Sequence, residues 1–109
     1  MIVRNKEIIE IKADNIAIGS YTEGQVQPYT NHSLVLEKGD TIYVFSDGYS
    51  DQFGGPDGKK FKINQFKMML LSLSGVPMHQ QQIALEKSIV EWRGVLQQVD
   101  DMLVIGVRV

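Results

Sequence analysis

The chain has 109 residues, of which 43% are hydrophobic and 22% charged, and its formal net charge at pH 7 is −2. These values are typical of one small globular domain and argue against a disordered segment or a nucleic-acid-binding protein. The absence of cysteine excludes disulfides, thiolate zinc sites and cysteine nucleophiles. No apolar run is long enough to span a bilayer and no signal peptide is visible, so we expect a soluble, cytoplasmic segment without membrane contact.

The N-terminal third predicts a hairpin followed by a loop. The chain opens on the apolar letters "MIV" without a polar lead-in, whereas domain edges usually fall in polar linkers, so we expect a segment of a longer protein. Residues 2–11 predict two short strands around a polar turn at residues 4–6. Residues 14–31 are rich in glycine and polar residues and predict a loop, with a short strand near residues 16–18.

Two further strands are predicted in "HSLVLEKGDTIYVFS". Alternating leucines predict a strand over residues 32–36, and a turn follows at residues 37–39. The next strand, residues 40–46, contains the continuously apolar run Ile42–Phe45. Such a run is typical of a central strand that is buried on both faces.

The period of the apolar residues then changes. After a glycine-rich surface loop at residues 54–58, two stripes with steps of three and four residues predict amphipathic helices. The first ends before Gly75 and Pro77, and the second covers residues 78–93 with Gly94 as its cap. The stripes are Ile63, Phe66, Leu70 and Leu73, then Leu85, Ile89, Trp92 and Leu96. A last strand is predicted at residues 102–107, and the whole order indicates an α+β layered fold.

Acidic residues stand at the ends of the two most apolar strands. Asp47 follows the central strand, and Asp100 and Asp101 precede the last one. If these strands are antiparallel neighbours, the acids meet at one sheet edge, where they repel unless a cation such as Mg²⁺ or Mn²⁺ neutralises them. Gly48 would allow a close backbone approach. The alternative is an ordinary Asp-Gly turn beside a solvated strand start, and the spacing alone leaves both interpretations open.

Other patterns give weaker signals. "GGPDGKK" lacks the spacing of a phosphate-binding loop, and Lys60 occupies the position where Ser or Thr would bind magnesium. Asp47 and Asp51 lack the acidic ladder of a calcium-binding loop. His32 and His79 stand alone, so a Ser–His–Asp triad has no support.

Two blocks, "KGDTIYVFSDGYSDQF" and "QVDDMLVIGVRV", lie about 50 residues apart. Together they resemble the two C-terminal signature blocks of PPM-type metal-dependent serine/threonine phosphatases, in the bacterial sporulation-stage-II-E-like branch. The resemblance covers residues 1–109 and implies the C-terminal portion of a single phosphatase domain. The complete domain is an α/β/β/α sandwich, of which this portion supplies antiparallel strands and one pair of helices, and its N-terminal half is absent here.

The resemblance also implies the site residues. Asp47 and Asp100 match the family's metal-binding aspartates, and Gly48, Asp51 and Asp101 have accessory positions, Asp101 orienting Asp100 or capping the strand. Family members hold two Mg²⁺ or Mn²⁺ ions, and a metal-bound water is the nucleophile, so no other catalytic side chain is implied. The family's remaining metal aspartates lie in the N-terminal half, so we expect weak or absent metal binding and little activity in this chain alone.

The expected function is that of a metal-dependent protein serine/threonine phosphatase in bacterial signal transduction and sigma factor regulation. Its substrate would be a phosphoserine or phosphothreonine protein, with anti-anti-sigma-like regulators as the implied class. The alternative is a phosphatase-like binding module without catalysis. Whether other domains anchor the parent protein in a membrane is left open. We also expect self-association, because the two helices can cover only one face of the sheet.

Overall fold

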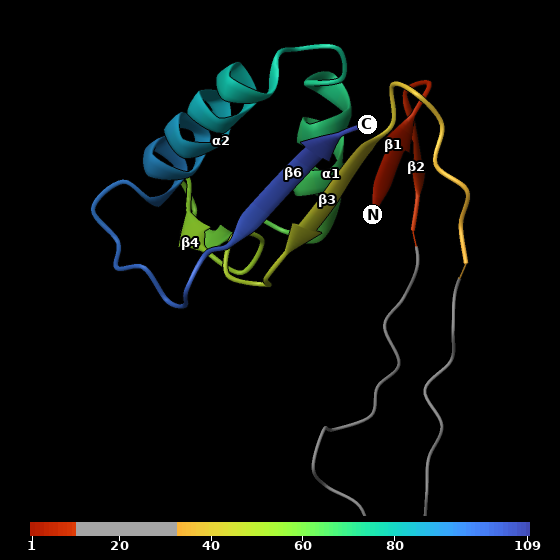
Figure 1. The fold of residues 1–109 in the computed structure, drawn as a ribbon. Coiled ribbons are helices and arrows are strands. Elements are labelled where there is room, and N and C mark those ends of the chain that lie inside the picture. The colour runs from red at the N-terminus through yellow and green to blue at the C-terminus, as the bar shows by residue number, and fades with distance from the viewer. Residues whose placement is uncertain (11–32) are drawn as a thin grey trace, which may run out of the picture.

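The computed structural model of the chain describes residues 1–10 and 33–109. Its main sheet has four antiparallel strands in the spatial order β2-β1-β3-β6 (Figure 1). These strands are β1 (Ile2–Arg4), β2 (Glu7–Ile9), β3 (Thr41–Phe45) and β6 (Val104–Arg108). A small hairpin of β4 (Phe53–Gly54) and β5 (Lys59–Lys60) precedes the helices α1 (Ile63–Ser72) and α2 (Met78–Arg93). None of the helices in the described part of the chain is long and apolar enough to cross a membrane.

The predicted α+β fold, the N-terminal hairpin and both helices are confirmed. Asn5 and Lys6 form the hairpin turn with φ of 49° and 62°. Two successive residues in this left-handed conformation give a turn whose twist matches that of the two flanking strands. Helix α2 has the predicted bounds and ends at Gly94, whose φ is 55°. The central and last strands are antiparallel neighbours, each shifted by one or two residues from the predicted ends.

Two local predictions are wrong. Residues 33–36 form no strand, because they have no ladder partner among the described residues, and the Val35 carbonyl instead accepts a hydrogen bond from the Arg4 side chain. Leu96, which the second helical stripe included, lies beyond the end of α2 and is 42% exposed. The predicted surface loop at residues 54–58 is confirmed, since its exposed residues 55–58 form the turn of the β4–β5 hairpin. The predicted strand at 16–18, the loop 14–31 and His32 lie outside the described residues.

Both helices pack on one face of the sheet. Alternate residues of β3 point toward them: the Tyr43 hydroxyl donates to Gln81 of α2, and the Phe45 ring lies 5.0 Å from that of Phe66 in α1. Burial of Tyr43, which is 2% exposed, raises the pKa of its hydroxyl. The core below the helices is a single cluster of Val3, Tyr43, Tyr49, Phe61, Phe66, Leu70, Leu85 and Ile89.

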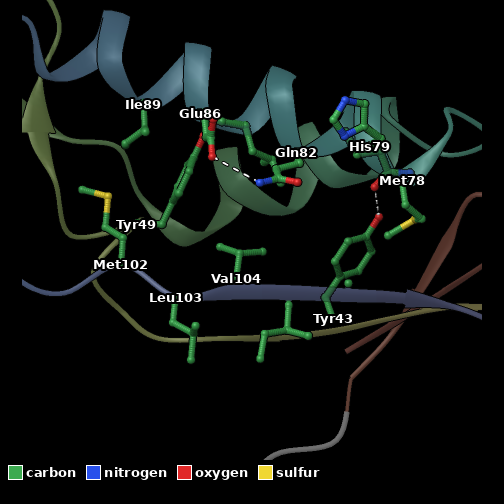
Figure 2. A pocket seen from close by; sticks show the side chains of 14 residues that line it. Tyr43, Tyr49, Met78, His79, Gln82, Glu86, Ile89, Met102, Leu103 and Val104 are labelled. Carbon is green, nitrogen blue, oxygen red and sulfur yellow. Dashed lines mark hydrogen bonds between the residues drawn. The ribbon is translucent and has the colours of Figure 1, made fainter.

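The opposite face of the sheet carries exposed apolar side chains. Val44 of β3 pairs with Ile105 of β6, and 58% and 48% of their surfaces are exposed. Figure 2 shows the reason, since Val104 points toward α2 whereas Leu103 points away from it. Leu103, Val107 and Val109 are also about half exposed. This bare face, defined by Val44, Leu103, Ile105, Val107 and Val109, is the side of the sheet that the two helices leave uncovered.

An ion pair closes the end of the sheet where β3 begins. Arg4 donates to both carboxylate oxygens of Asp40, at 2.9 and 2.7 Å, and the main-chain N–H of Glu37 donates to the same carboxylate. Asp40 is only 1% exposed. The Arg4 guanidinium, helped by the Glu37 N–H, lowers the pKa of Asp40 from 3.8 to about 2. This arrangement ties β1 to the 37–40 turn.

Replacement of Asp40 by Asn is expected to lower the unfolding temperature at neutral pH, because the amide cannot accept both Arg4 hydrogen bonds. A carboxyl group whose pKa is lower in the folded state stabilises the protein above its unfolded pKa, and this stabilisation disappears as the pH falls. The wild-type chain should therefore lose stability between pH 4 and pH 2. The Asp40→Asn variant should lose less over that interval, measured by thermal unfolding at each pH.

Glu37→Gln is the matched control, because the Glu37 carboxylate lies 3.3 Å from Arg4 but is 62% exposed. Exposed ion pairs contribute little to stability. If Asp40→Asn and Glu37→Gln lowered the unfolding temperature equally, the role assigned to the buried Arg4–Asp40 pair would be contradicted.

Self-association is expected through the bare face and the neighbouring edge of β6. In the described sheet β6 pairs with β3 alone, and residues 102–107 contain no proline or charge to protect its other edge. A second copy of the chain, related by a twofold axis, would cover both features. Sedimentation over a concentration series should show species larger than 12.3 kDa. Ile105→Asp should shift these species toward the monomer. Val90→Asp is the control, because Val90 is an exposed residue of α2, and it should not change the distribution. A wild-type chain that stays monomeric at every concentration would contradict this prediction.

Candidate metal centre at the β3–β6 edge

The β3–β6 ladder brings the two acidic segments to the same edge of the sheet. The ladder continues past β3: the Ser46 N–H donates to the Leu103 carbonyl at 2.9 Å. The Ser46 hydroxyl then donates to the Asp101 carbonyl at 2.9 Å and accepts from the Leu103 N–H at 3.0 Å. Ser46 directly precedes Asp47, and its partner Asp101 directly follows Asp100. These hydrogen bonds therefore hold the two acidic segments side by side.

Gly48 allows the two segments to touch. A Cβ atom at this position would lie 2.1 Å from the Asp101 carbonyl oxygen, far inside van der Waals contact. The close contact at Gly48 is with the main chain of Asp101, and the accessory role expected for Gly48 at a metal site stays a prediction. Only a residue without a side chain fits between the turn and the start of the last strand.

The turn that carries Asp47 is anchored on the core. The Asp47 carbonyl accepts from the Asp51 N–H at 2.9 Å and from the Ser50 hydroxyl at 3.2 Å, which closes one helical turn. Tyr49 is 3% exposed, and its hydroxyl donates to the Leu85 carbonyl of α2. Burial raises the pKa of this hydroxyl. The Tyr49 side chain thus fixes the turn from below, while Asp47 is exposed on its surface.

The other predicted residues also have defined places. Asp100 is exposed, and its carboxylate accepts from the Asp101 N–H at 2.8 Å, so Asp101 touches Asp100 through its main chain. The Asp51 carboxylate lies 3.8 Å from the Lys60 ammonium group of β5, in an exposed ion pair. Asp51 is thus oriented toward the β4–β5 hairpin.

The donor set fits part of a hard-cation site. Asp47 and Asp100 are exposed carboxylates on adjoining segments, and oxygen ligands of this kind suit Mg²⁺ and Mn²⁺. Over residues 1–10 and 33–109, no group of three or more His, Cys, Asp or Glu side chains is arranged to hold a metal ion. These ions take about six ligands, so this segment by itself would leave most positions to water or to ligands from elsewhere.

Sequence reasoning missed two buried residues beside this edge. Gln52 is completely buried and hydrogen-bonds to residues 97 and 99, and the Trp92 indole N–H donates to the Gln52 carbonyl at 3.0 Å. Gly54 packs so closely on Trp92 that a Cβ atom would lie 1.9 Å from the Trp92 carbonyl. The letters "DQFGG" alone give no periodic signal for such packing, because it depends on the end of α2, some 40 residues later.

A groove of about 680 Å³ lies between α2 and β6 (Figure 2). Apolar side chains line it from both elements, Leu85 and Ile89 from α2 and Val104 from β6, and Gln82 and Glu86 contact each other at 3.4 Å along its rim. The lining includes neither Asp47 nor Asp100, so the acidic edge and the groove are separate features. Figure 2 shows His79 at the far end of the groove, on α2.

We expect Gly48→Ala to destabilise the protein by about 1–3 kcal/mol, the usual cost of forcing a methyl group into a filled site. The main chains of the turn and of Asp101 must separate to admit it. Chemical denaturation measures the change. Asp47→Asn, which leaves the same backbone contact intact, should change stability little, and a Gly48→Ala variant as stable as the wild type would contradict the observed packing.

The chain is similar in sequence and in fold to known proteins. The model of the stage II sporulation protein E (SpoIIE) family matches residues 1–109. The SiaA-PP2C domain of Pseudomonas aeruginosa is 32% identical, with a TM-score of 0.72 over 74% of this chain and 33% of that one. The Mn-presoaked phosphatase domain of the cell fate determinant SpoIIE from Bacillus subtilis is 24% identical, with a TM-score of 0.61 over 99% of this chain and 44% of that one. No curated protein matches the chain.

The chain spans 33% and 44% of these two structures, so it corresponds to part of each phosphatase domain. The family match covers every residue from 1 to 109 and confirms the resemblance noted in the two sequence blocks. The chain belongs to the SpoIIE family, and its two helices and antiparallel sheet are part of the PP2C-type (PPM) phosphatase fold.

Proposed function

We propose that the chain is the C-terminal portion of a metal-dependent protein serine/threonine phosphatase domain. The observation that carries this proposal is the junction of the Asp47 turn with the Asp100 segment through Ser46 and Gly48. Membership of the SpoIIE family supports the same reaction class. The remainder of the domain, with the further metal ligands, would come from a part of the protein outside this chain.

Asp47 and Asp100 would be this portion's ligands to Mg²⁺ or Mn²⁺. When bound, such ions supply a water of lowered pKa for attack on phosphorus and neutralise charge on the phosphoryl group. The chain's own contribution would be to bring the two carboxylates to one edge of the sheet, on the turn after β3 and on the segment before β6. Asp51, 45% exposed and paired with Lys60, would have an accessory role near the ligands.

The substrate would be a phosphoprotein. Asp47 and Asp100 lie on the surface of the described segment, so a phosphorylated side chain on a folded partner could reach them without entering the groove. Regulatory phosphoproteins of bacterial signalling, of the anti-anti-sigma-like class, suit the family and are the substrates we propose. Dephosphorylation of such a regulator would place the parent protein in sigma factor regulation, in the cytoplasm.

The proposal is tested by phosphate release from a phosphoserine peptide with Mn²⁺, using the protein that carries the complete domain. Asp47→Asn and Asp100→Asn should each lower turnover at least 100-fold, because each removes a charged ligand. Asp57→Asn is the matched control, since this exposed acid lies in the β4–β5 turn and should leave turnover unchanged.

The chain of residues 1–109 alone is expected to release little phosphate even at high Mn²⁺, because two carboxylates do not hold two ions in place. A non-catalytic binding module would instead show no turnover in the complete domain and no effect of either substitution. Full activity of the complete domain in both Asp variants would refute the proposed metal site.

A further inference from the structure

Gln52 is the most deeply buried polar residue near the acidic edge. None of its surface is exposed, although it belongs to the loop between β3 and β4. A buried primary amide is costly unless each of its hydrogen-bonding groups has a partner. The contacts of Gln52 therefore show what this position is built to hold.

Every polar group of the Gln52 side chain is satisfied by main-chain atoms. Its amide nitrogen donates to the carbonyl oxygens of Gln97, at 2.9 Å, and Phe53, at 3.0 Å. Its side-chain oxygen accepts from the Val99 N–H at 3.3 Å. Two carbonyls face the nitrogen and one N–H faces the oxygen, so only this orientation of the amide satisfies all three groups.

The Gln52 main chain adds attachments on its other side. Its carbonyl accepts from the Phe61 N–H at 2.9 Å, just before α1, and from the Trp92 indole at the end of α2. The residue therefore connects the Asp47 turn, the segment before α1, the end of α2 and the 97–99 segment. Its position is fixed from several directions, which makes it a rigid point of attachment.

The segment that Gln52 holds is otherwise exposed. All residues from 94 to 101 lie at the surface, and Val95 and Val99 are 102% and 58% exposed. Gln52 binds this segment immediately before Asp100, through Gln97 and Val99, and Ser46 binds it immediately after, through Asp101. Ser46 and Gln52 themselves lie on either side of Asp47. The two acids are thus bracketed by the same pair of residues.

We infer that Gln52 is a positioning residue that sets where Asp100 lies relative to Asp47. This inference rests on the proposed function, because it concerns the readiness of two ligands for one metal centre. A ligand on a free loop must lose conformational freedom when the metal binds, which weakens binding. Residues that orient metal ligands typically change metal affinity 10–100-fold when they are replaced.

The test follows amide NMR signals of the protein that carries the complete domain during a Mn²⁺ titration, because paramagnetic broadening detects even weak binding. Gln52→Met keeps the length of the side chain but none of its hydrogen bonds, and Gln52→Ala removes both. In each variant the Mn²⁺ concentration for half-broadening at Asp47 and Asp100 should rise about 10-fold. Hydrogen exchange at Val99 should accelerate at least 10-fold, whereas exchange at Val44, in the middle of the β3–β6 ladder, should remain slow.

Gln97→Ala is the matched control, because Gln97 meets Gln52 through its main-chain carbonyl and that bond survives the substitution. It should titrate as the wild type does. Unchanged half-broadening in Gln52→Met, together with unchanged Val99 exchange, would overturn the positioning role. Faster Val99 exchange with unchanged Mn²⁺ titration would also overturn it, since the tether would then be structural only. Absence of wild-type broadening at Asp47 and Asp100 would instead overturn the metal centre itself, and the inference with it.

Discussion

The antiparallel pairing of β3 with β6 is the constraint on which the rest of the structure depends. Five residue pairs, from Thr41 with Arg108 to Phe45 with Val104, join segments about 60 residues apart in sequence. Because the strands run in opposite directions, the end of one must lie beside the start of the other. The turn after β3 and the segment before β6 are therefore neighbours, whatever the loops between them do.

The two ends of this ladder differ in how their acidic residues are buried and paired. At one end, main-chain hydrogen bonds join Gly39 and Asp40 to Val109, and the buried Arg4–Asp40 pair ties β1 to the same place. The Arg4 guanidinium lowers the pKa of the Asp40 carboxylate to about 2, so at neutral pH this group is charged and paired. At the other end, Asp47 and Asp100 stay exposed. The structure thus pairs one buried acid at one end of the ladder and leaves two acids exposed at the other.

A line of aromatic rings connects the sheet to the acidic edge. Phe45 contacts Phe66, Phe66 contacts Tyr49, and Tyr49 contacts Phe61, with centroids 4.7–5.4 Å apart. Phe61 in turn meets Trp92, also at 5.4 Å. Edge-to-face and tilted contacts of this kind favour fixed geometry as well as burial. The segment from residue 46 to residue 62, which includes the β4–β5 hairpin, is consequently held from inside, although its acids face the solvent.

The bare face and the acidic edge are consistent with a part of a larger domain. Apolar residues of β3 and β6 on the side away from the helices remain about half exposed. The related phosphatase structures are two to three times longer than the portion that this chain matches. The bare face and the acidic edge lie on β3 and β6 or at their ends, so in the proposed function a second layer and further metal ligands would both meet the chain at these two strands.

The sequence by itself determined the strong periodic elements, namely both helices, the central strand and the last strand. It also determined the family, since the Ser-Asp-Gly and Asp-Asp blocks carry the resemblance that the family match confirms. Local patterns suffice there, because helix stripes and apolar runs are set by neighbouring residues. The metal roles of Asp47 and Asp100 remain predictions.

The tertiary structure alone decided which residues surround those acids. Residues 33–36 alternate as a strand does but have no partner in the described sheet, so pairing overrides propensity there. The contact of Gly48 with Asp101 and the burial of Gln52 under residues 97–99 join positions more than 40 residues apart. No local pattern encodes such contacts, because a polar residue becomes a buried tether only when distant chain segments fold around it.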